Sequence, residues 1–498
     1  MLIRKILPLG LFLLVSQLVV AQGIISNNWC GTTGMSPWLM QYQNHREDVQ
    51  YRSGDSTWLY VPMTIQIVGN DAGGGYFPID LAFRVVCEMN EQYHDAHIRY
   101  YLMPGDAIRY LNNTKWYMHD FDGGSELINT NRLPDRVNAF VVADPAGNCG
   151  YSWQDAIVLG KNCSTVGNST WAHEAGHHLS LPHPFVGWEG TTFNYSNPAP
   201  DSVGGNAVER VDGSNCYEAA DRFCDTHPDY INYRWPCDGN FESQFTLKDP
   251  VGAEFKSDAS LIMGYSYDAC ASRFTPEQIA AMRANLNTEH ASYLQITEPL
   301  AEIADDTMVQ LISPIDSATV QFDKFKLHWN KVPNATYYLV DVSISKSFAP
   351  KMVLETVYDD TTLLVDKPIP NNRIMYWRVR AYSEWDVCQT DDNAQLGVFR
   401  TRNLSATNEL ENLLVADLTP NPVAGGAVAT LLIITEESSD ALLQVTDMSG
   451  RLCQQHPVRL SSGENLLDIS TDHLQAGLYT VILRNEKGAI IRRLAVAE

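Results

Sequence analysis

The sequence predicts an α+β domain followed by two all-β sandwich domains. Residues 61–68 alternate and are rich in β-branched side chains, as expected of a strand, whereas residues 80–93 place apolar side chains at helical spacing. Further along the chain, residues 325–344 and 375–382 return to strict alternation without helical spacing. The chain has 498 residues, which is too long for one ordinary domain. We therefore interpret these changes of pattern as domain boundaries.

Residues 1–21 have the features of a secretory signal. Arg4 and Lys5 supply the positive start, and residues 6–20 form a short, interrupted apolar run before a small residue, Ala21. The run is too short for a membrane anchor, and no later stretch is apolar enough to span a bilayer. We therefore expect an exported protein without a transmembrane segment.

The first domain is expected to combine a sheet with several helices. The strand at 61–68 precedes the helix over 80–93, for which Asp80 is the expected cap. A strand within 151–160 contains Ala-Ile-Val-Leu and is expected at the edge of the sheet. The remaining elements are strands at 98–102 and 137–142 and a helix over 274–283, with Thr275 as its cap and Pro276 in its first turn.

The most informative motif contains three histidines and a glutamate. His173 and His177 are four residues apart, so on a helix they share one face and can bind the same ion. Glu174 is one step around the helix, which suits a base that acts on water. If the helix ends before His183, this residue can fold back as a third ligand. Three histidines leave one zinc position open for water, whose pKa falls to about 7. The motif predicts hydrolysis of peptide bonds.

A second segment strengthens this prediction. Residues 260–270 form an expected tight turn that carries Met263 and Tyr265. With the histidine motif, this turn makes the chain resemble the metzincin metallopeptidases and, within them, the pappalysin family. The resemblance implies zinc bound by the three histidines, Glu174 as the base, Met263 in a turn beneath the metal, and Tyr265 at the oxyanion. It also implies that the edge strand pairs with substrate and that a basic residue follows the cleaved bond.

One residue departs from the family motif. This chain has Ser180 at the position where the family has a glycine. That position requires a positive φ, which serine adopts at a cost of about 1 kcal/mol. This cost is small beside a zinc binding energy on the order of 10 kcal/mol. The alternative function is a surface binding or adhesion protein with an inactive metalloprotease-like domain. Ser180 favours that alternative, whereas the intact Glu174 beside three histidines opposes it.

Charge and cysteine content indicate the environment of the protein. The net charge of −24 argues against nucleic acids and anionic membranes as partners. Ten cysteines in an exported chain predict disulfide bonds. The resemblance to pappalysins implies a bond between Cys237 and Cys270. Spacing alone suggests two further bonds, Cys216 with Cys224 and Cys149 with Cys163.

Cys30 lies in the sequence Asn-Trp-Cys-Gly-Thr-Thr, shortly after the signal. Bacterial pappalysin-like precursors carry Cys-Gly-Thr here, within a short pro-segment. The resemblance implies that the Cys30 thiolate occupies the open zinc position and keeps the enzyme latent. The polar residues 41–57 are the expected exposed connector, open to cleavage. A structural disulfide between Cys30 and Cys87 is the alternative.

The long polar loop after His183 carries several acidic residues. Asp221, Asp225, Thr226 and Asp229 resemble the acidic loop of the family. Such loops can hold calcium through carboxylate and carbonyl oxygens. A solvated acidic loop without an ion is the alternative, and the sequence assigns no calcium ligands.

The last two domains are both expected to be sandwiches. An early tryptophan and the later strand Tyr-Trp-Arg-Val-Arg resemble a fibronectin type III domain, which would serve as a spacer or an adhesive module. The segments 418–422, 447–451 and 474–481 resemble the C-terminal sorting domain of type IX secretion in Bacteroidetes. That resemblance implies the type IX machinery as a partner and export through the periplasm to the cell surface or the medium. One more small sandwich without an export role is the alternative.

These observations divide the chain into five segments. They are a signal peptide at 1–21, a pro-segment at 22–55, a zinc metallopeptidase domain at 56–298, a fibronectin type III-like domain at 306–402 and a sorting domain at 413–498.

Overall fold

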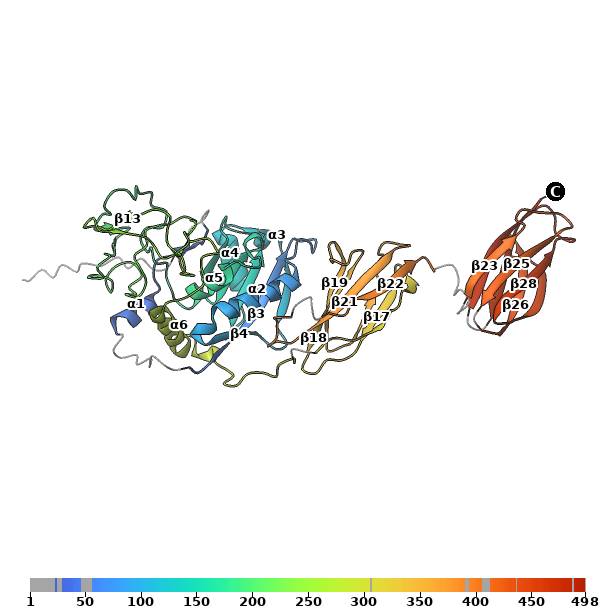
Figure 1. Ribbon diagram of the computed structural model, residues 1–498, viewed down its shortest axis with the longest axis horizontal. Coiled ribbons are helices and arrows are strands. Elements are labelled where there is room, and N and C mark those ends of the chain that lie inside the picture. The colour runs from blue at the N-terminus through green and yellow to red at the C-terminus, as the bar shows by residue number, and fades with distance from the viewer. Residues whose placement is uncertain are drawn as a thin grey trace, which may run out of the picture. The chain divides into compact units, whose positions relative to one another are not determined.

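The computed structural model describes most of the chain (Figure 1). The described residues are 23–24, 29–45, 56–304, 307–389, 394–404, 413–435, 437–485 and 488–497. The predicted signal peptide and residues 46–55 of the connector lie outside them. The chain forms two compact units. Unit 1 comprises Met1–Asp305 with two short segments, 333–336 and 382–390, and unit 2 comprises the rest.

Unit 1 contains a six-stranded sheet in the order β4-β3-β7-β10-β9, with β5 also paired to β3. Every pair is parallel except β10 with β9. The strands predicted at 61–68, 98–102 and 137–142 are confirmed. The bounds are β3 Leu59–Gly69, β4 Ile98–Leu102, β5 Ile108–Asn112, β7 Val137–Val142, β9 Gly150–Trp153 and β10 Ala156–Gly160.

The prediction that the Ala-Ile-Val-Leu run forms the edge strand is wrong. The Ala-Ile-Val-Leu run forms β10, which lies between β7 and β9, and all five of its residues are buried. The edge is β9, which the chain reaches first before it turns back to pair with β10. A continuous apolar run is typical of a strand covered on both faces, and this explains the interior position of β10.

Several helices of unit 1 pack against this sheet. Helix α4 (Phe121–Asn131) contributes Leu127 and Ile128 to a cluster with Phe140 and Val158 from the sheet. Helix α5 (Thr170–His178) contacts β9 and β10. Helix α6 begins after Thr275, whose side chain forms a capping box with Gln278, as the predicted cap requires. The other helical bounds are α1 Pro37–Asn44, α2 Ile79–Gln92, α3 Thr114–Tyr117, α6 Pro276–Thr288, η1 His94–Ala96, η2 Lys161–Cys163 and η3 Ala291–Tyr293.

Helix α2 begins at Ile79, one residue earlier than predicted. Its N-terminal cap is Pro78, which forms no side-chain capping bond, and Asp80 lies within the first turn. An acidic side chain in the first turn interacts favourably with the positive end of the helix dipole. Acidic residues are therefore common both at the cap and in the first turn, and the sequence does not distinguish the two positions.

Disulfide bonds connect the loops of unit 1. The predicted pairs Cys149–Cys163, Cys216–Cys224 and Cys237–Cys270 are all present. Cys87 pairs with Cys388 and not with Cys30, so the alternative of a Cys30–Cys87 bond is wrong. The short strands of unit 1 are β1 Gly23–Ile24, β2 Thr32–Thr33, β6 Met118–His119, β8 Asp144–Pro145, β11 Ser202–Val203, β12 Asn206–Ala207, β13 Leu247–Lys248 and β14 Glu254–Phe255.

The first β region of unit 2 has a three-stranded sheet, β15-β17-β20, and a five-stranded sheet, β16-β22-β21-β18-β19. Phe325 of β17 contacts Phe399 of β22 with ring centroids 5.2 Å apart, so the two sheets share a core. The early tryptophan, Trp329, and Trp377 are both fully buried. The bounds are β15 Leu311–Ser313, β16 Ala318–Gln321, β17 Phe325–Trp329, β18 Tyr337–Ser343, β19 Lys351–Tyr358, β20 Thr362–Val365, β21 Ile374–Tyr382 and β22 Gly397–Arg402.

The second β region has the sheets β23-β25-β28 and β24-β30-β29-β26-β27. Alternate residues of both sheets, among them Leu431, Ile433, Leu443 and Val481, form one apolar core. A sandwich buries the inner face of each sheet in this way. The bounds are β23 Leu413–Thr419, β24 Val423–Ala424, β25 Val428–Thr435, β26 Ser439–Asp447, β27 Leu452–Leu460, β28 Gly463–Ser470, β29 Gly477–Asn485 and β30 Gly488–Ala497.

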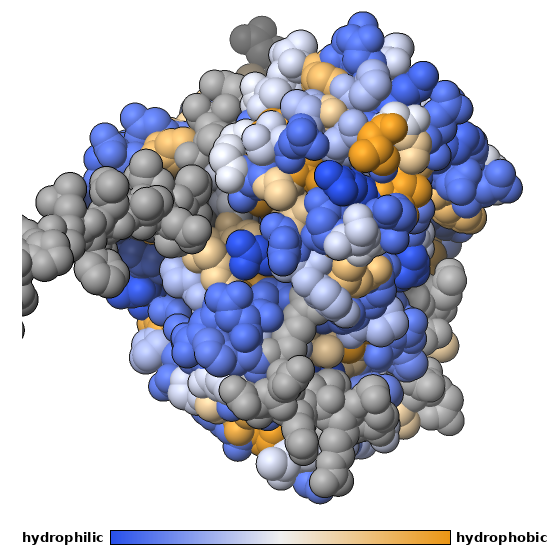
Figure 2. Space-filling view, turned by 90° about the vertical axis from the view of Figure 1, so that its left-hand side faces the viewer, coloured by the Kyte–Doolittle hydropathy of each residue, from blue (hydrophilic) through white to orange (hydrophobic). Residues whose placement is uncertain are grey.

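The surface shows no large hydrophobic patch of described residues on the face drawn in Figure 2. The face in Figure 2 is mainly hydrophilic, and its hydrophobic residues form small groups. Among the described residues, none of the helices combines the length and the apolar character needed to cross a bilayer.

Candidate metal centre

Helix α5 and the turn after it bring the three predicted histidines together. His173 and His177 lie on one face of the helix, and the chain turns back immediately after it. Ser180 adopts a φ of 72°, as the sequence predicts, and the amide of Leu181 donates to the carbonyl of Gly176 at 2.9 Å. Asn285 donates to the Ser180 hydroxyl at 3.1 Å and supports this conformation. The turn carries His183 back to the helix.

The three imidazoles point their Nε2 atoms at one another. The distances are 3.1 Å for His177 to His173, 3.1 Å for His177 to His183 and 3.3 Å for His183 to His173. The Nδ1 atoms of His173 and His177 lie 2.7 Å from the carbonyl oxygens of Ile262 and Leu181. Because a carbonyl oxygen can only accept a hydrogen bond, each Nδ1 is the donor and each Nε2 carries a lone pair.

This donor set fits a zinc ion. Nitrogen atoms about 2.1 Å from a tetrahedral ion are separated by about 3.4 Å, close to the distances between these three atoms. Three buried lone pairs at such separations repel one another unless a cation lies between them. Burial lowers the pKa of His173 and His177 well below the usual value, so these rings stay neutral and able to bind a metal.

Glu174 lies beside the histidines and is fully buried. Its Oε2 has no hydrogen-bond partner among the described residues, and burial raises the pKa of this carboxyl to about 8. A Cβ atom on Gly150 would lie 2.8 Å from Glu174 Cγ, so this position of β9 has to be glycine. The Glu174 side chain therefore packs directly on the backbone of the edge strand β9 at Gly150.

The predicted turn lies beneath the histidines. Met263 is fully buried, and its sulfur packs so closely on Gly176 that a Cβ there would approach it to 2.4 Å. The Tyr265 ring packs edge-on against His183, with centroids 4.9 Å apart, and its hydroxyl donates to the carbonyl of Cys30 at 3.2 Å. The bond between Cys237 and Cys270 ties this turn to the preceding loop.

Cys30 is the fourth member of the cluster. Its sulfur and one nitrogen of each of the three histidines all lie within 4.8 Å of one another, and all four residues are buried. Burial and the charge of Glu174 raise the pKa of this thiol. The backbone around Cys30 pairs in parallel with β9, because Gly31 donates to Gly150 and Cys149 donates to Trp29, both at 2.8 Å. The segment around Cys30 thus lies across the histidine cluster as an added strand.

Glu189 is a further residue of the cluster that was not predicted from the sequence. Its Oε1 lies 3.4 Å from His183 Nδ1, and its Oε2 accepts from the Gly187 amide at 2.7 Å. A carboxylate in this position orients a metal-binding histidine. Glu189 follows His183 by six residues. In a loop such a spacing does not indicate that two side chains are in contact, so the sequence contains no usable signal for this pair.

The acidic loop contains several buried carboxyl groups, among them Glu209, Asp221 and Asp229. Asp221 Oδ1 accepts from Phe223 and Thr226, whereas its Oδ2 has no hydrogen-bond partner in the described part of the chain. Burial raises the pKa of both Asp221 and Glu209, and the charge of Asp221 raises that of Glu209 further. Asp229, by contrast, accepts from Ile231 and Ser257. Asp221 is therefore the acid of this group that keeps an unpaired buried oxygen.

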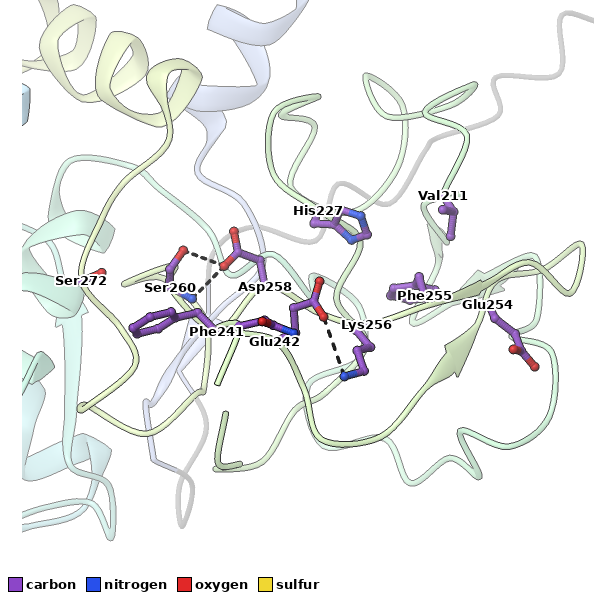
Figure 3. Close-up of a pocket in the computed structure, with 11 residues that line it drawn as sticks. Val211, His227, Phe241, Glu242, Glu254, Phe255, Lys256, Asp258, Ser260 and Ser272 are labelled. Atoms are coloured by element: carbon purple, nitrogen blue, oxygen red, sulfur yellow. Dashed lines mark hydrogen bonds and ion pairs between the residues drawn. The ribbon is translucent and has the colours of Figure 1, made fainter. Parts of the chain in front are cut away.

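Figure 3 shows a cavity of about 660 Å³ in the same loops. Its charged side chains already have partners. Lys256 lies 2.6 Å from Asp238 and 3.7 Å from Glu242, while Asp258 accepts from Ser260 and pairs with Arg273 at 2.6 Å. We assign no chemistry to this cavity.

A comparison with protein families identifies the C-terminal region. Residues 418–497 match the secretion system C-terminal sorting domain. The chain therefore carries a type IX sorting domain, as the sequence predicts, and is exported by this route in Bacteroidetes to the cell surface or the medium. The match spans only the last domain, and no curated protein matches the chain.

Solved structures give only distant similarity. The BSP domain of a biofilm associated protein is 15% identical, with a TM-score of 0.16, over 38% of this chain and 30% of that one. Dimeric latent PorU from Porphyromonas gingivalis is 16% identical, with a TM-score of 0.16, over 39% of this chain and 20% of that one. The chain spans less than a third of either relative, and neither similarity bears on the metal centre.

Truncation before Leu413 should leave the protein in the periplasm of its host, because the sorting domain directs the final step of export. Fractionation of cells that express the full and truncated chains measures this. Correct disulfide bonds in the truncated protein serve as the folding control. Appearance of that protein on the cell surface or in the medium would show that export does not depend on residues 413–498.

Proposed function

We propose that this protein is a secreted zinc-dependent endopeptidase made as a latent precursor. The observation that carries the proposal is the convergence of three histidine Nε2 atoms within 3.3 Å, with Glu174 buried beside them. The edge strand β9 runs past this centre, where an extended peptide can add to the sheet. A surface binding function would use neither the carboxylate nor the converging nitrogen atoms.

The proposed chemistry divides among five side chains: the three histidines, Glu174 and Tyr265. A zinc ion held by the three histidines would supply a Lewis acid and lower the pKa of water to about 7. Glu174 accepts the proton of the attacking water and passes it to the leaving amine. Tyr265 donates a hydrogen bond to the oxygen of the cleaved carbonyl. In the precursor that same hydroxyl donates to the carbonyl of Cys30, so the pro-segment occupies the position of a substrate carbonyl.

His177→Ala should abolish stoichiometric zinc binding, because His177 Nε2 lies closest to both other ligand atoms. Elemental analysis of purified precursor measures the metal content, with one equivalent expected in the wild type. His178→Ala is the matched control, since this neighbouring histidine is equally buried but stacks on His290, outside the cluster. Full zinc retention in His177→Ala would refute the ligand assignment.

We further propose a calcium ion at Glu209 and Asp221. Burial raises the pKa of both carboxyl groups, and the charge of Asp221 raises that of Glu209 further, so a bound cation would stabilise the charged forms. Calcium accepts carboxylate, hydroxyl and carbonyl oxygens. Asp221 Oδ2 is the free acceptor, and Thr226 lies beside it.

Calcium at 10 mM should therefore raise the melting temperature of the zinc-loaded protein. A dissociation constant of about 10⁻⁴ M gives about 2.7 kcal/mol, which corresponds to several degrees for a domain of this size. Scanning calorimetry with equal magnesium as the reference measures the shift. Asp221→Asn should remove it, and Asp201→Asn, an exposed residue of the same loop, should not. An equal shift in Asp221→Asn would place calcium elsewhere.

A further inference from the structure

The side chain of Trp29 lies in a defined set of contacts next to the metal centre. Its ring centroid is 4.6 Å from that of His173 and 5.1 Å from that of Tyr265, both edge-on. The guanidinium of Arg234 stands over the same ring, with its carbon 4.3 Å from the centroid. We call the place formed by His173, Arg234 and Tyr265 the Trp29 subsite.

This subsite lies on the path of an extended chain through the centre. Trp29 and Gly31 form the two backbone hydrogen bonds that add the pro-segment to the edge strand. The residue between them, Cys30, places its thiol among the three histidines. Trp29 is therefore the side chain directly next to the residue at the metal. In a bound substrate, that position belongs to a residue flanking the cleaved bond.

The subsite offers no unpaired Asp268 oxygen to a basic side chain. The Oδ2 of Asp268 lies 2.6 Å from Arg234 Nη2. Its Oδ1 accepts from the amide and the hydroxyl of Ser169, at 3.1 and 2.8 Å. Both carboxylate oxygens are thus engaged within the protein, and Arg234 already holds the place in which a lysine or arginine of the substrate would pair with Asp268.

The same arrangement favours an aromatic side chain. The Arg234 side chain is only 23% exposed, and a partly desolvated guanidinium attracts the face of an aromatic ring. Asp268 fixes the orientation of the guanidinium, so its face stays directed at the place of Trp29. The edge-on contacts from His173 and Tyr265 complete an aromatic environment.

We propose that the Trp29 subsite selects substrates with an aromatic residue directly beside the cleaved bond, with Arg234 as the specificity-determining residue. This inference rests on the proposed peptidase function. It replaces the basic preference that the resemblance to pappalysins implies.

The first test uses full-length protein activated by cleavage in the connector. Peptides that differ only in one residue, placed in turn on each side of the cleaved bond, compare tryptophan, phenylalanine, leucine and lysine through kcat/KM. We expect an aromatic preference of about 5- to 30-fold over leucine, the range of a partly desolvated cation–π contact, and a larger one over lysine. Arg234→Ala should lose the preference over leucine. Arg210→Ala, an arginine of the same unit with a 3.9 Å surface ion pair, is the matched control and should keep it.

Two outcomes of this test would overturn the inference while leaving the peptidase function intact. One is a wild-type enzyme that cleaves lysine peptides best, and the other is an Arg234→Ala variant with an unchanged aromatic preference. Absence of cleavage of every peptide would instead count against the proposed function.

The second test does not depend on catalysis. In a Cys453→Ala background, Cys30 is the remaining free thiol, so its rate of reaction with a thiol reagent reports how firmly the pro-segment is held. Trp29→Phe should react at a rate near that of the wild type, whereas Trp29→Lys and Arg234→Ala should react at least about tenfold faster, from the loss of ring packing and the cation–π contact. A Trp29→Lys precursor as unreactive as the wild type would show that the subsite has no aromatic preference.

Discussion

Glu174→Ala should bind one equivalent of zinc, fold normally and lose peptide hydrolysis by a factor of about 10²–10⁴ in kcat, the usual contribution of a positioned base. The reason is the division of roles in α5. The histidine nitrogen atoms converge on one point, whereas the carboxylate is directed toward Gly150 of the edge strand and has a free oxygen. Kinetics of activated protein on a peptide substrate, combined with elemental analysis, measure both properties.

The control for this variant is Glu91→Ala, an exposed glutamate on α2 whose loss should not change the rate. Loss of zinc from Glu174→Ala would make the carboxylate a ligand. An active, zinc-loaded Glu174→Ala protein would exclude Glu174 as the base.

Cys30→Ala should convert the latent precursor into one that is active without added protease. The thiol lies among the three histidines, where it takes the place that water needs, and zinc binds thiolates readily. Without it, the segment keeps its backbone bonds to β9, the bond from Tyr265 to the carbonyl of residue 30 and its other side-chain contacts, but no ligand for the metal. Peptide cleavage and the appearance of a cut in the connector, both measured over time in purified precursor, report the change.

Cys453→Ala is the matched control for this variant, since Cys453 is the other free cysteine and lies in the sorting domain. It should stay latent. A Cys30→Ala precursor that keeps its four disulfide bonds but remains inactive would show that the added strand alone blocks the site.

Local patterns made much of the site predictable. The spacing of His173 and His177 follows from the period of a helix, and the turn at Ser180 brings His183 back to these two histidines. Disulfide partners that lie close together in the sequence, such as Cys216 and Cys224, could also be predicted. In each case the determining contacts span only a few residues, so the sequence contains them directly.

Contacts between distant residues were not predictable in this way. An Ala-Ile-Val-Leu run suits an edge or an interior strand, and only the pairing of β10 with both β7 and β9 decides between them. The contact between Trp29 and Arg234 depends on a loop about 200 residues away, which the turn at Met263 and the Cys237–Cys270 bond hold in place. No periodicity in the sequence reports such a contact.

The free state of Cys30 sets an order of events in biogenesis. Eight cysteines form four bonds, while Cys30 stays reduced in a chain that folds in an oxidising compartment. Its protection is kinetic, since a buried thiol cannot meet an oxidant or a partner thiol. Docking of the pro-segment must therefore come before, or coincide with, closure of the surrounding bonds. In this way the segment that we propose keeps the enzyme latent would also keep the Cys30 thiol out of disulfide exchange while the chain matures.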